Sequence, residues 1–483
     1  MKRFFWFSVI VISLILLTEW CYSLEMPKEK KSICEWIDKN KDYICGISDK
    51  IWEYAETSMI EYKSSRLLRD GLEKAGFRIK NDVAGMPTAF VAEYGSGKPV
   101  IGMLAEYDAL PGLSQKTSTI KESLISNGAG HGCGHNLLGT ASFGAAIALK
   151  DFMEKNNVKG TIKLFGCPAE ETLVGKIFMV RDGILDGVDA VIDWHPGDST
   201  RASYSSSLAM NSFKVRFFGK TAHAAGQPWA GRSALDAVEL MDYGVNMMRE
   251  HIKPTARIHY VITNGGKAPN VVPDNAEVWY FVRDEKRESV DNLYQWVLDI
   301  AKGAASSTQT TYEVQFITGC YELLGNKTGA EIIQRNLEII GPPDFTEEEQ
   351  KFAKEIQKAM GEEENGVSEA ISELTPPKPQ PEGGSTDVAD VSWVVPVGRF
   401  TAATELGKIP GHSWGIVACG KMEIGHKGMI VASKTIALSV FDLLTKKELL
   451  ENMKTEWKEK TKGFIYKCAV PSEIGPPVLP EPK

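Results

Sequence analysis

Residues 160–171 read GTIKLFGCPAEE: an apolar run, a Pro-Ala pair and then two adjacent glutamates. The apolar part has the length and composition of a buried β-strand. Comparable runs that end in polar residues occur at 98–112 and 187–198, and a helix rich in small residues is expected over 136–155. Strands that alternate with loops and helices in this way predict an α/β domain.

Polar residues gather at the ends of these predicted strands, which is where α/β sheets bind their ligands. They are Glu106, Asp108, Glu170, Glu171 and His195. Neighbouring residues on an extended chain point to opposite sides, so Glu170 and Glu171 should have different tasks. One can bind a metal ion while the other takes a proton from a water molecule. The alternative is a solvated helix start with glutamates in its first turn.

A second unit follows, in which the strand and helix patterns have the order βαββαβ. That order predicts a ferredoxin-like domain inserted into the first one. The expected boundaries are 26–207 and 320–450 for the α/β domain, 208–319 for the insertion and 451–483 for a C-terminal tail. The acidic stretch 345–375 is interpreted as a solvated surface insertion whose first helix is capped by Thr346 and Glu349.

The N-terminus and the charge bear on location and partners. Residues 1–23 combine Lys2 and Arg3 with an apolar run, which is typical of a signal peptide. We therefore expect an exported protein, periplasmic or secreted, without a stable membrane anchor; an uncleaved anchor is the alternative. The formal net charge of −8 gives no indication of a nucleic-acid partner. Seven cysteines remain after cleavage, and Cys34 and Cys45 could pair if their geometry allows.

Residues 131–136 read HGCGHN and hold two of the eight histidines in the chain. Cys133 and His135 lie two positions apart, and the adjacent glycines permit unusual backbone angles, so both side chains can face one ion. A thiolate and an imidazole suit zinc or a similar ion. A glycine-rich turn that contains a buried cysteine is one alternative, and a nucleophilic thiol is another.

Two further histidines lie in short polar or glycine-containing stretches. His195 stands in DWHPG and His412 in IPGHSWG. Either could be a buried histidine held by a backbone hydrogen bond, but neutral imidazole is also the commonest metal ligand. Together with Cys133, His135 and Glu171 they supply five donors from four separated loops, which is enough for a two-metal site.

Several motifs stand in a fixed order along the chain. They are EYDALPG (106–112), GHGCGHN (130–136), PAEE (168–171), WHP (194–196), GKTAHAA (219–225), NGGKAPNVVPDNAEVWYFVR (264–283), STDVADVSWVVP (385–396), PGHSW (410–414) and GHKGM (425–429). In these motifs the chain resembles the superfamily of dimetal amidohydrolases and metallopeptidases that includes aminoacylases, carboxypeptidase G and auxin-conjugate hydrolases. Auxin-conjugate relatives usually have aspartate at the position of Asn136. They usually have Asp-Met-Asp at the position where this chain has Glu106, Tyr107 and Asp108. The chain therefore resembles more closely the group formed by the B subunits of aminobenzoyl-glutamate hydrolases.

This resemblance implies a fold and a cofactor. The fold would be a zinc-peptidase-like catalytic domain, with a mixed sheet flanked by helices, and an inserted ferredoxin-like domain that acts as a lid and forms a homodimer. The cofactor would be two divalent metal ions, Mn²⁺ or Zn²⁺. Their ligands would be Cys133, which bridges the ions, His135, Glu171, His195 and His412.

The resemblance also implies roles for other residues. Glu170 would be the general base that acts on a metal-activated water, and Asp108 would orient a metal ligand. His223 would reach the active site of the partner subunit and stabilise the oxyanion. Asn270 and Arg283 would hold the substrate, since a guanidinium can grip a carboxylate with two hydrogen bonds.

The predicted function is metal-dependent hydrolysis of the amide bond of an N-acyl amino acid or of a dipeptide-like substrate such as aminobenzoyl-glutamate. The alternatives are an N-acyl-amino-acid hydrolase of the auxin-conjugate or hippurate type, a non-catalytic metal-binding protein on the same fold, and a thiol enzyme that uses Cys133. The presence of Glu170 beside a full ligand set weighs against a non-catalytic protein. His131 and His426 are interpreted as supporting residues rather than metal ligands.

Overall fold

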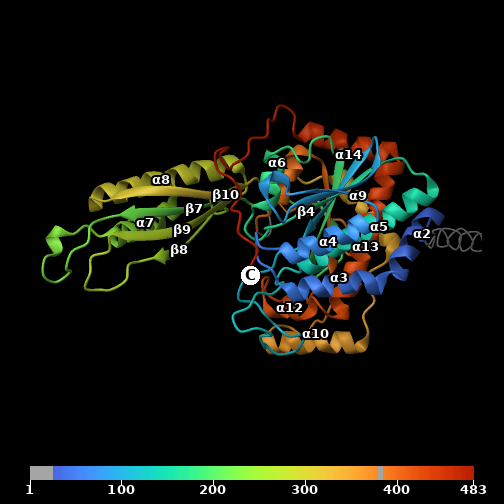
Figure 1. Ribbon diagram of the computed structural model, residues 1–483, viewed down its shortest axis with the longest axis horizontal. Coiled ribbons are helices and arrows are strands. Elements are labelled where there is room, and N and C mark those ends of the chain that lie inside the picture. The colour runs from blue at the N-terminus through green and yellow to red at the C-terminus, as the bar shows by residue number, and fades with distance from the viewer. Residues whose placement is uncertain (1–25, 379–383, 483) are drawn as a thin grey trace, which may run out of the picture.

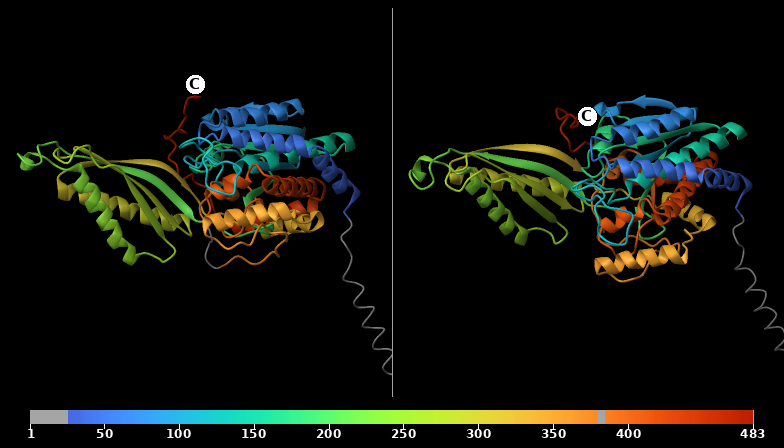
Figure 2. Two further views of the ribbon diagram at one scale, coloured as in Figure 1. Left: turned by 90° about the horizontal axis from the view of Figure 1, so that it is seen from below. Right: turned by 60° about the horizontal axis from the view of Figure 1, so that its bottom comes forward.

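The computed structural model describes residues 26–378 and 384–482, and the predicted signal peptide (1–23) lies outside the described residues. A larger domain carries a narrow inserted domain that extends from one side (Figures 1 and 2). The larger domain is built on a seven-stranded sheet with the strand order β1-β2-β4-β3-β5-β11-β6. Its strands are β1 (Arg78–Asn81), β2 (Phe90–Ser96), β3 (Val100–Glu106), β4 (Gly160–Cys167), β5 (Ala190–Gly197), β6 (Arg201–Ser203) and β11 (Val397–Ala403).

The sheet is mixed, as expected. β3 is parallel to β4 and β5, and β5 is parallel to β11, whereas β1, β2 and β6 run antiparallel to their neighbours. The parallel strands are buried on both faces, which explains their nearly continuous apolar sequences. Because these strands are parallel, their carboxyl ends meet at one edge of the sheet, and the polar residues that follow them are brought together there.

Helices cover both faces of this sheet. One face packs against α2 (Lys28–Lys39), α3 (Lys41–Tyr54), α4 (Tyr62–Lys74), α5 (His135–Asn156), α9 (Lys327–Ile340) and α13 (Glu423–Thr445). The other face packs against α6 (Gly175–Arg181) and α11 (Val388–Val394). α13 is long and apolar enough to cross a membrane, but 83% of its apolar stretch is buried inside the protein, so it is a core helix here.

The inserted domain is a four-stranded antiparallel sheet in the order β10-β7-β9-β8, packed against two helices. Its elements are β7 (Ala209–Phe218), α7 (Ala234–Met248), β8 (Arg257–Asn264), β9 (Asn275–Asp284), α8 (Arg287–Thr308) and β10 (Thr311–Cys320). This is the βαββαβ order expected from the sequence, and the ferredoxin-like fold is confirmed. Short 3₁₀ turns occur at η1 (Val83–Gly85), η2 (Pro228–Ala230) and η3 (Arg249–His251).

The expected C-terminal tail (451–483) contains most of a helix and packs on the larger domain. The boundary expected at residue 450 falls inside α14 (Lys447–Lys460), which is bonded to the start of α9 where Asn326 Nδ2 donates to the carbonyl of Met453 at 2.9 Å. The segment after α14 has no regular element, yet it packs back on the larger domain: Val470 is buried, and the Tyr466 hydroxyl donates to Asp390 at 2.6 Å. The segment after α14 is placed by long-range packing, which leaves no local periodicity in the sequence.

Two smaller expectations can be compared with the structure. The acidic stretch begins with α10 (Glu347–Met360), and both hydrogen bonds of the capping box between Thr346 and Glu349 are present. α12 (Trp414–Cys419) lies near it. Cys34 and Cys45 do not pair; both thiols are free and buried in the apolar core between α2, α3 and their neighbours.

Candidate active site

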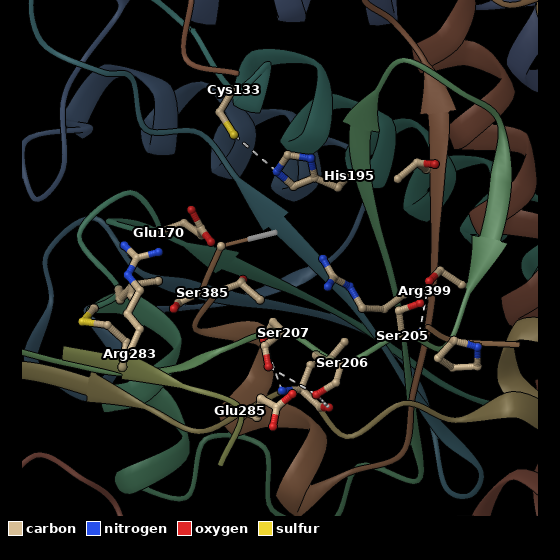
Figure 3. A pocket seen from close by; sticks show the side chains of 18 of the residues that line it. Cys133, Glu170, His195, Ser205, Ser206, Ser207, Arg283, Glu285, Ser385 and Arg399 are labelled. Carbon is tan, nitrogen blue, oxygen red and sulfur yellow. Dashed lines mark hydrogen bonds between the residues drawn. The ribbon is translucent and has the colours of Figure 1, made fainter. Parts of the chain in front are cut away.

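A cavity of about 650 Å³ lies at the carboxyl edge of the large sheet, against the base of the inserted domain. Its walls bring together Cys133, Glu170, Glu171, His195 and His412. Figure 3 shows Cys133 and His195 facing each other at one end, with Glu170 below them. The sulfur of Cys133 is 3.4 Å from Nε2 of His195. Loops that are far apart in the sequence therefore converge on one chemical site.

The loop that carries Cys133 is shaped by its glycines. Gly134 precedes α5 in the left-handed region (φ 73°), and a Cβ there would lie 2.9 Å from the ring of Pro196. No other residue fits this position without strain. His131 is buried and its Nε2 bonds to the carbonyl of Ile51 at 3.0 Å, so it supports the loop and does not face the cavity.

The five predicted donors form two groups that share one sulfur. Donor atoms of Cys133, His135 and His195 lie within 4.8 Å of one another, and so do those of Cys133, Glu171 and His412. Nε2 of His135 and Oε1 of Glu171 are buried without a hydrogen-bond partner among the described residues. Buried polar atoms are normally paired. A cysteine sulfur, three imidazoles and a carboxylate in this arrangement are a donor set that would hold divalent cations.

Asp108 connects the two groups from behind. One carboxylate oxygen lies 2.8 Å from Nδ1 of His135, and the other accepts the amide N–H of Glu171 at 2.9 Å. Asp108 and His135 are both fully buried. A carboxylate on Nδ1 fixes the ring and leaves Nε2 for another partner.

The two glutamates differ in environment. Burial, followed by the charge of Glu106, raises the pKa of Glu170 well above its usual value. Burial also raises the pKa of Glu171, to about 7. An oxygen of Glu170 lies 3.9 Å from Nε2 of His135, so this carboxyl group stands beside the donor groups that share Cys133. A buried carboxyl group at this position is suited to exchange a proton with a group in the site.

A buried lysine next to the site was missed in the sequence. Nζ of Lys176 lies 2.8 Å from Glu106 and 2.6 Å from Asp387, and its side chain is 1% exposed. The other oxygen of Glu106 is 3.3 Å from Nε2 of His135. Donor atoms of Glu106, His135 and Glu170 also lie within 4.8 Å of one another, but Lys176 already supplies a positive charge there. The feature of the sequence that could have revealed it is a single lysine inside the apolar run of α6.

The cavity extends away from the donors toward several groups that sequence reasoning did not select. Arg399 on β11 lines it (Figure 3), and Nε of Arg399 is bonded to the buried Asp193 at 2.6 Å. Ser205, Ser206 and Ser207 line the far end. Residues 375–378 also form part of the wall. The last residue of the acidic stretch (345–375), interpreted as a solvated surface segment, and the three residues after it thus reach the site.

The residues expected on the inserted domain do not all meet at this cavity. Arg283 on β9 lines it, whereas His223 and Asn270 are exposed and are not among its described lining residues. Those two segments lie together: the amide of Ala224 donates to the carbonyl of Asn270 at 3.0 Å. His426 lies in the first turn of α13, and its Nε2 is 2.9 Å from Asp49.

A mixed α/β sheet, an inserted ferredoxin-like domain, and thiolate, imidazole and carboxylate groups at one cavity together define a hydrolase of the metallopeptidase class. The chain belongs to peptidase family M20/M25/M40, whose model matches residues 102–412. Members of this family hydrolyse amide bonds, and the protein is an amidohydrolase.

Individual relatives agree with this assignment. The chain is 40% identical to the B subunit of p-aminobenzoyl-glutamate hydrolase from Escherichia coli (strain K12), over 94% of this chain and 100% of the relative. It is 28% identical to the Xaa-Arg dipeptidase of Mus musculus, over 90% and 94% of the two chains. Among solved structures, an aminobenzoyl-glutamate utilization protein from Klebsiella pneumoniae superposes with a TM-score of 0.56 at 17% identity, covering 85% of this chain and 98% of the other. A dinuclear metal-binding M20 peptidase from Bacillus subtilis superposes with a TM-score of 0.55 at 19% identity, covering 85% and 99%.

Proposed function

We propose that the protein cleaves the amide bond of N-acyl amino acids or dipeptide-like substrates such as aminobenzoyl-glutamate, with two divalent cations, Mn²⁺ or Zn²⁺. The observation that carries this proposal is the pair of donor groups that share Cys133, next to the buried carboxyl group of Glu170. The Escherichia coli relative is named as a subunit of p-aminobenzoyl-glutamate hydrolase, and this similarity supports the choice of substrate class. The cation ligands in this proposal are Cys133, His135, Glu171, His195 and His412.

The protein's own groups divide the chemistry between them. When bound, the cations would polarise the scissile carbonyl and activate a water molecule. Glu170 would take a proton from the water as its oxygen adds to the carbonyl carbon, and would deliver that proton to the amine as the C–N bond breaks. Asp108 keeps Nδ1 of His135 engaged at 2.8 Å, so that Nε2 remains directed at the site.

Arg283 is proposed to hold the carboxylate of the substrate. It lines the cavity and lies on the same side as Glu170 in the view of Figure 3. Its Nε is buried, and within the described part of the chain this atom has no hydrogen-bond partner. A guanidinium with open donors beside the reacting centre matches the free carboxylate of an N-acyl amino acid in charge and shape. Arg399, by contrast, already uses Nε on Asp193.

We expect the metal-loaded enzyme to hydrolyse N-acyl amino acids, aminobenzoyl-glutamate among them, far faster than the same compounds with the carboxylate capped as an amide. Arg283→Gln should lower kcat/KM for the free acids by roughly 10- to 150-fold, the equivalent of about 1.5–3 kcal/mol for a hydrogen bond to a charged group. It should leave the capped compounds almost unchanged. The measurement is steady-state kinetics on paired substrates.

Arg257→Gln provides a matched control. Arg257 faces Arg283 in the register of β8 and β9, but its guanidinium donates to the carbonyl of Ala256 at 2.8 Å. It should retain the wild-type preference for the free acid. The assignment of Arg283 fails if both variants behave alike. The proposed function fails if metal-loaded wild-type protein cleaves no compound in a broad panel of N-acyl amino acids.

We propose that the inserted domain forms a homodimer through β8 and α7. β8 is the edge strand of its sheet and exposes Val261 and Ile262, and α7 exposes Tyr243 and Met247 beside it. The two elements are joined where Asn246 Nδ2 donates to the Tyr260 hydroxyl at 3.2 Å. An open strand edge with apolar side chains is suited to pairing with a second chain. In this arrangement His223 would serve the site of the partner subunit.

Ile262→Lys should convert the dimer into a monomer, because a charge at the strand edge opposes pairing. Trp296→Lys is the matched control: Trp296 on α8 is 40% exposed, as is Ile262. Light scattering after size-exclusion chromatography measures the masses. A monomeric wild-type protein would contradict the proposal and favour a second kind of chain as partner, since the Escherichia coli relative is named as one of the subunits of its hydrolase.

A further inference from the structure

The loop that presents Glu170 has an unusual backbone. Ala169 and Leu173, on either side of the glutamate pair, have φ angles of 57° and 55°. Residues with a Cβ rarely adopt this left-handed region, and they remain there only when surrounding contacts hold them. The position of the Glu170 carboxyl group therefore depends on whatever fixes this loop.

One of those contacts comes from a residue far away in the sequence. The carboxyl oxygen Oε1 of Glu61 accepts the amide N–H of Ala169 at 2.9 Å and that of Met59 at 2.9 Å. Its Oε2 accepts the hydroxyl of Thr88 at 3.0 Å. The amide of Glu171, on the other side of Glu170, is held by Asp108 at 2.9 Å. Two buried carboxyl groups thus grip the backbone immediately before and immediately after Glu170.

Glu61 stands at the N-cap position of α4, but its side chain does not cap that helix. It directly precedes α4, and no hydrogen bond joins its carboxyl group to the first turn of that helix. Glu56 does so instead, with Oε1 accepting the amide of Lys63 at 3.0 Å and Oε2 accepting that of Ser64 at 2.8 Å. The side chain of Glu61 is fully buried. Burying a carboxyl group is costly, and here one of the three hydrogen bonds that it accepts holds the Glu170 loop through Ala169.

We propose that Glu61 is a positioning residue for catalysis, which holds the amide of Ala169 so that the Glu170 carboxyl group keeps its place beside the cation ligands. This inference rests on the proposed role of Glu170. It does not make Glu61 a catalytic residue, because Glu61 lies behind the loop and is not among the described residues that line the cavity. Displacements of about 1 Å at a reacting group can cost roughly 100-fold in rate.

The test compares three single variants with the wild type. Glu61→Ala should lower kcat by roughly 10- to 100-fold, with KM changed by less than about 3-fold and metal content unchanged. Glu61→Gln keeps an oxygen for the two amides and should stay within about 3-fold of the wild-type kcat. Glu56→Ala is the matched control, because it removes the cap of α4 and should lower the melting temperature while kcat is retained.

A double-variant cycle separates positioning from a general structural effect. If Glu61 acts through Glu170, Glu61→Ala should lower the residual rate of Glu170→Gln by less than about 3-fold, far from the product of the two single losses. Multiplicative losses would overturn the proposal, and so would a Glu61→Gln variant as slow as Glu61→Ala.

If Glu61→Ala does not fold, Glu61→Asp takes its place, because its side chain is one methylene shorter and its carboxyl group cannot reach the same amides. The kcat of Glu61→Asp should then be well below that of Glu61→Gln. Equal kcat values for these two variants would overturn the proposal. Wild-type turnover is measured first. An inactive wild type counts against the proposed function, and an active wild type with an equally active Glu61→Ala counts against Glu61 alone.

Discussion

Glu170→Gln is expected to lower kcat by about 10²- to 10⁴-fold, the usual contribution of a general acid–base group, while the protein stays folded and binds its cations. The carboxamide has the same shape as the carboxyl group but cannot take a proton. The substitution removes the titrating group itself, whose pKa is raised first by burial and then by the charge of Glu106. Steady-state assays with a good substrate, together with metal analysis of the same sample, provide the measurement.

The neighbouring glutamate gives the contrast for this prediction. Glu171 belongs to a donor group with Cys133 and His412, so Glu171→Gln should lose bound cation as well as activity. The two variants would then be equally slow but different in metal content. A Glu170→Gln variant that keeps more than about a tenth of the wild-type kcat would remove Glu170 from the role of base.

Removal of divalent cations by a chelator is expected to reduce activity to below about 1% and to lower the melting temperature, and both should return with Mn²⁺ or Zn²⁺. Cations that bind the folded state stabilise it by mass action, by about 2.7 kcal/mol at a free concentration 100 times Kd. Without them, Nε2 of His135 and Oε1 of Glu171 remain buried and unpaired among the described residues. Activity assays and thermal melts before and after dialysis provide the measurement.

The same experiment decides between a metal-dependent enzyme and a thiol enzyme. A mechanism with Cys133 as nucleophile would survive chelation, because the attacking group is the sulfur itself. Burial raises the pKa of the Cys133 thiol, which disfavours a free thiolate in the absence of a cation. Full activity after complete removal of the cations would therefore overturn the metal-dependent function. Cys133→Ala should lose cation binding and activity together.

The fold could be predicted from the sequence because its signals are local. The apolar run of β4 and the βαββαβ order of the insertion depend on periodicities that a few residues carry by themselves. The packing position of α14 and of the segment after it could not be assigned in the same way. Their place is determined by contacts with distant partners, such as the bond between Tyr466 and Asp390 and that between Asn326 and Met453.

The site shows the same division. The donor residues Cys133, His135, Glu171, His195 and His412 could be selected from the sequence because loops after parallel strands must meet at one edge, and because these residue types bind cations. Lys176 and Glu61 could not, since a charged residue in a helix or beside one is ordinarily solvated. Only the folded chain shows that both are buried and that each contacts a residue next to the site, Lys176 through Glu106 and Glu61 through Ala169.

The sequence by itself determined the two-domain architecture, the family motifs and the chemical types at the site. The tertiary structure decided which of those groups meet, that Cys133 is common to two donor groups, and that His223 and Asn270 lie away from the cavity of their own chain. It also decided what lies behind the site: Ala169 and Glu61 are 108 residues apart, yet joined by one hydrogen bond. Local composition sets which chemistry is possible, and long-range packing sets the distances on which that chemistry depends.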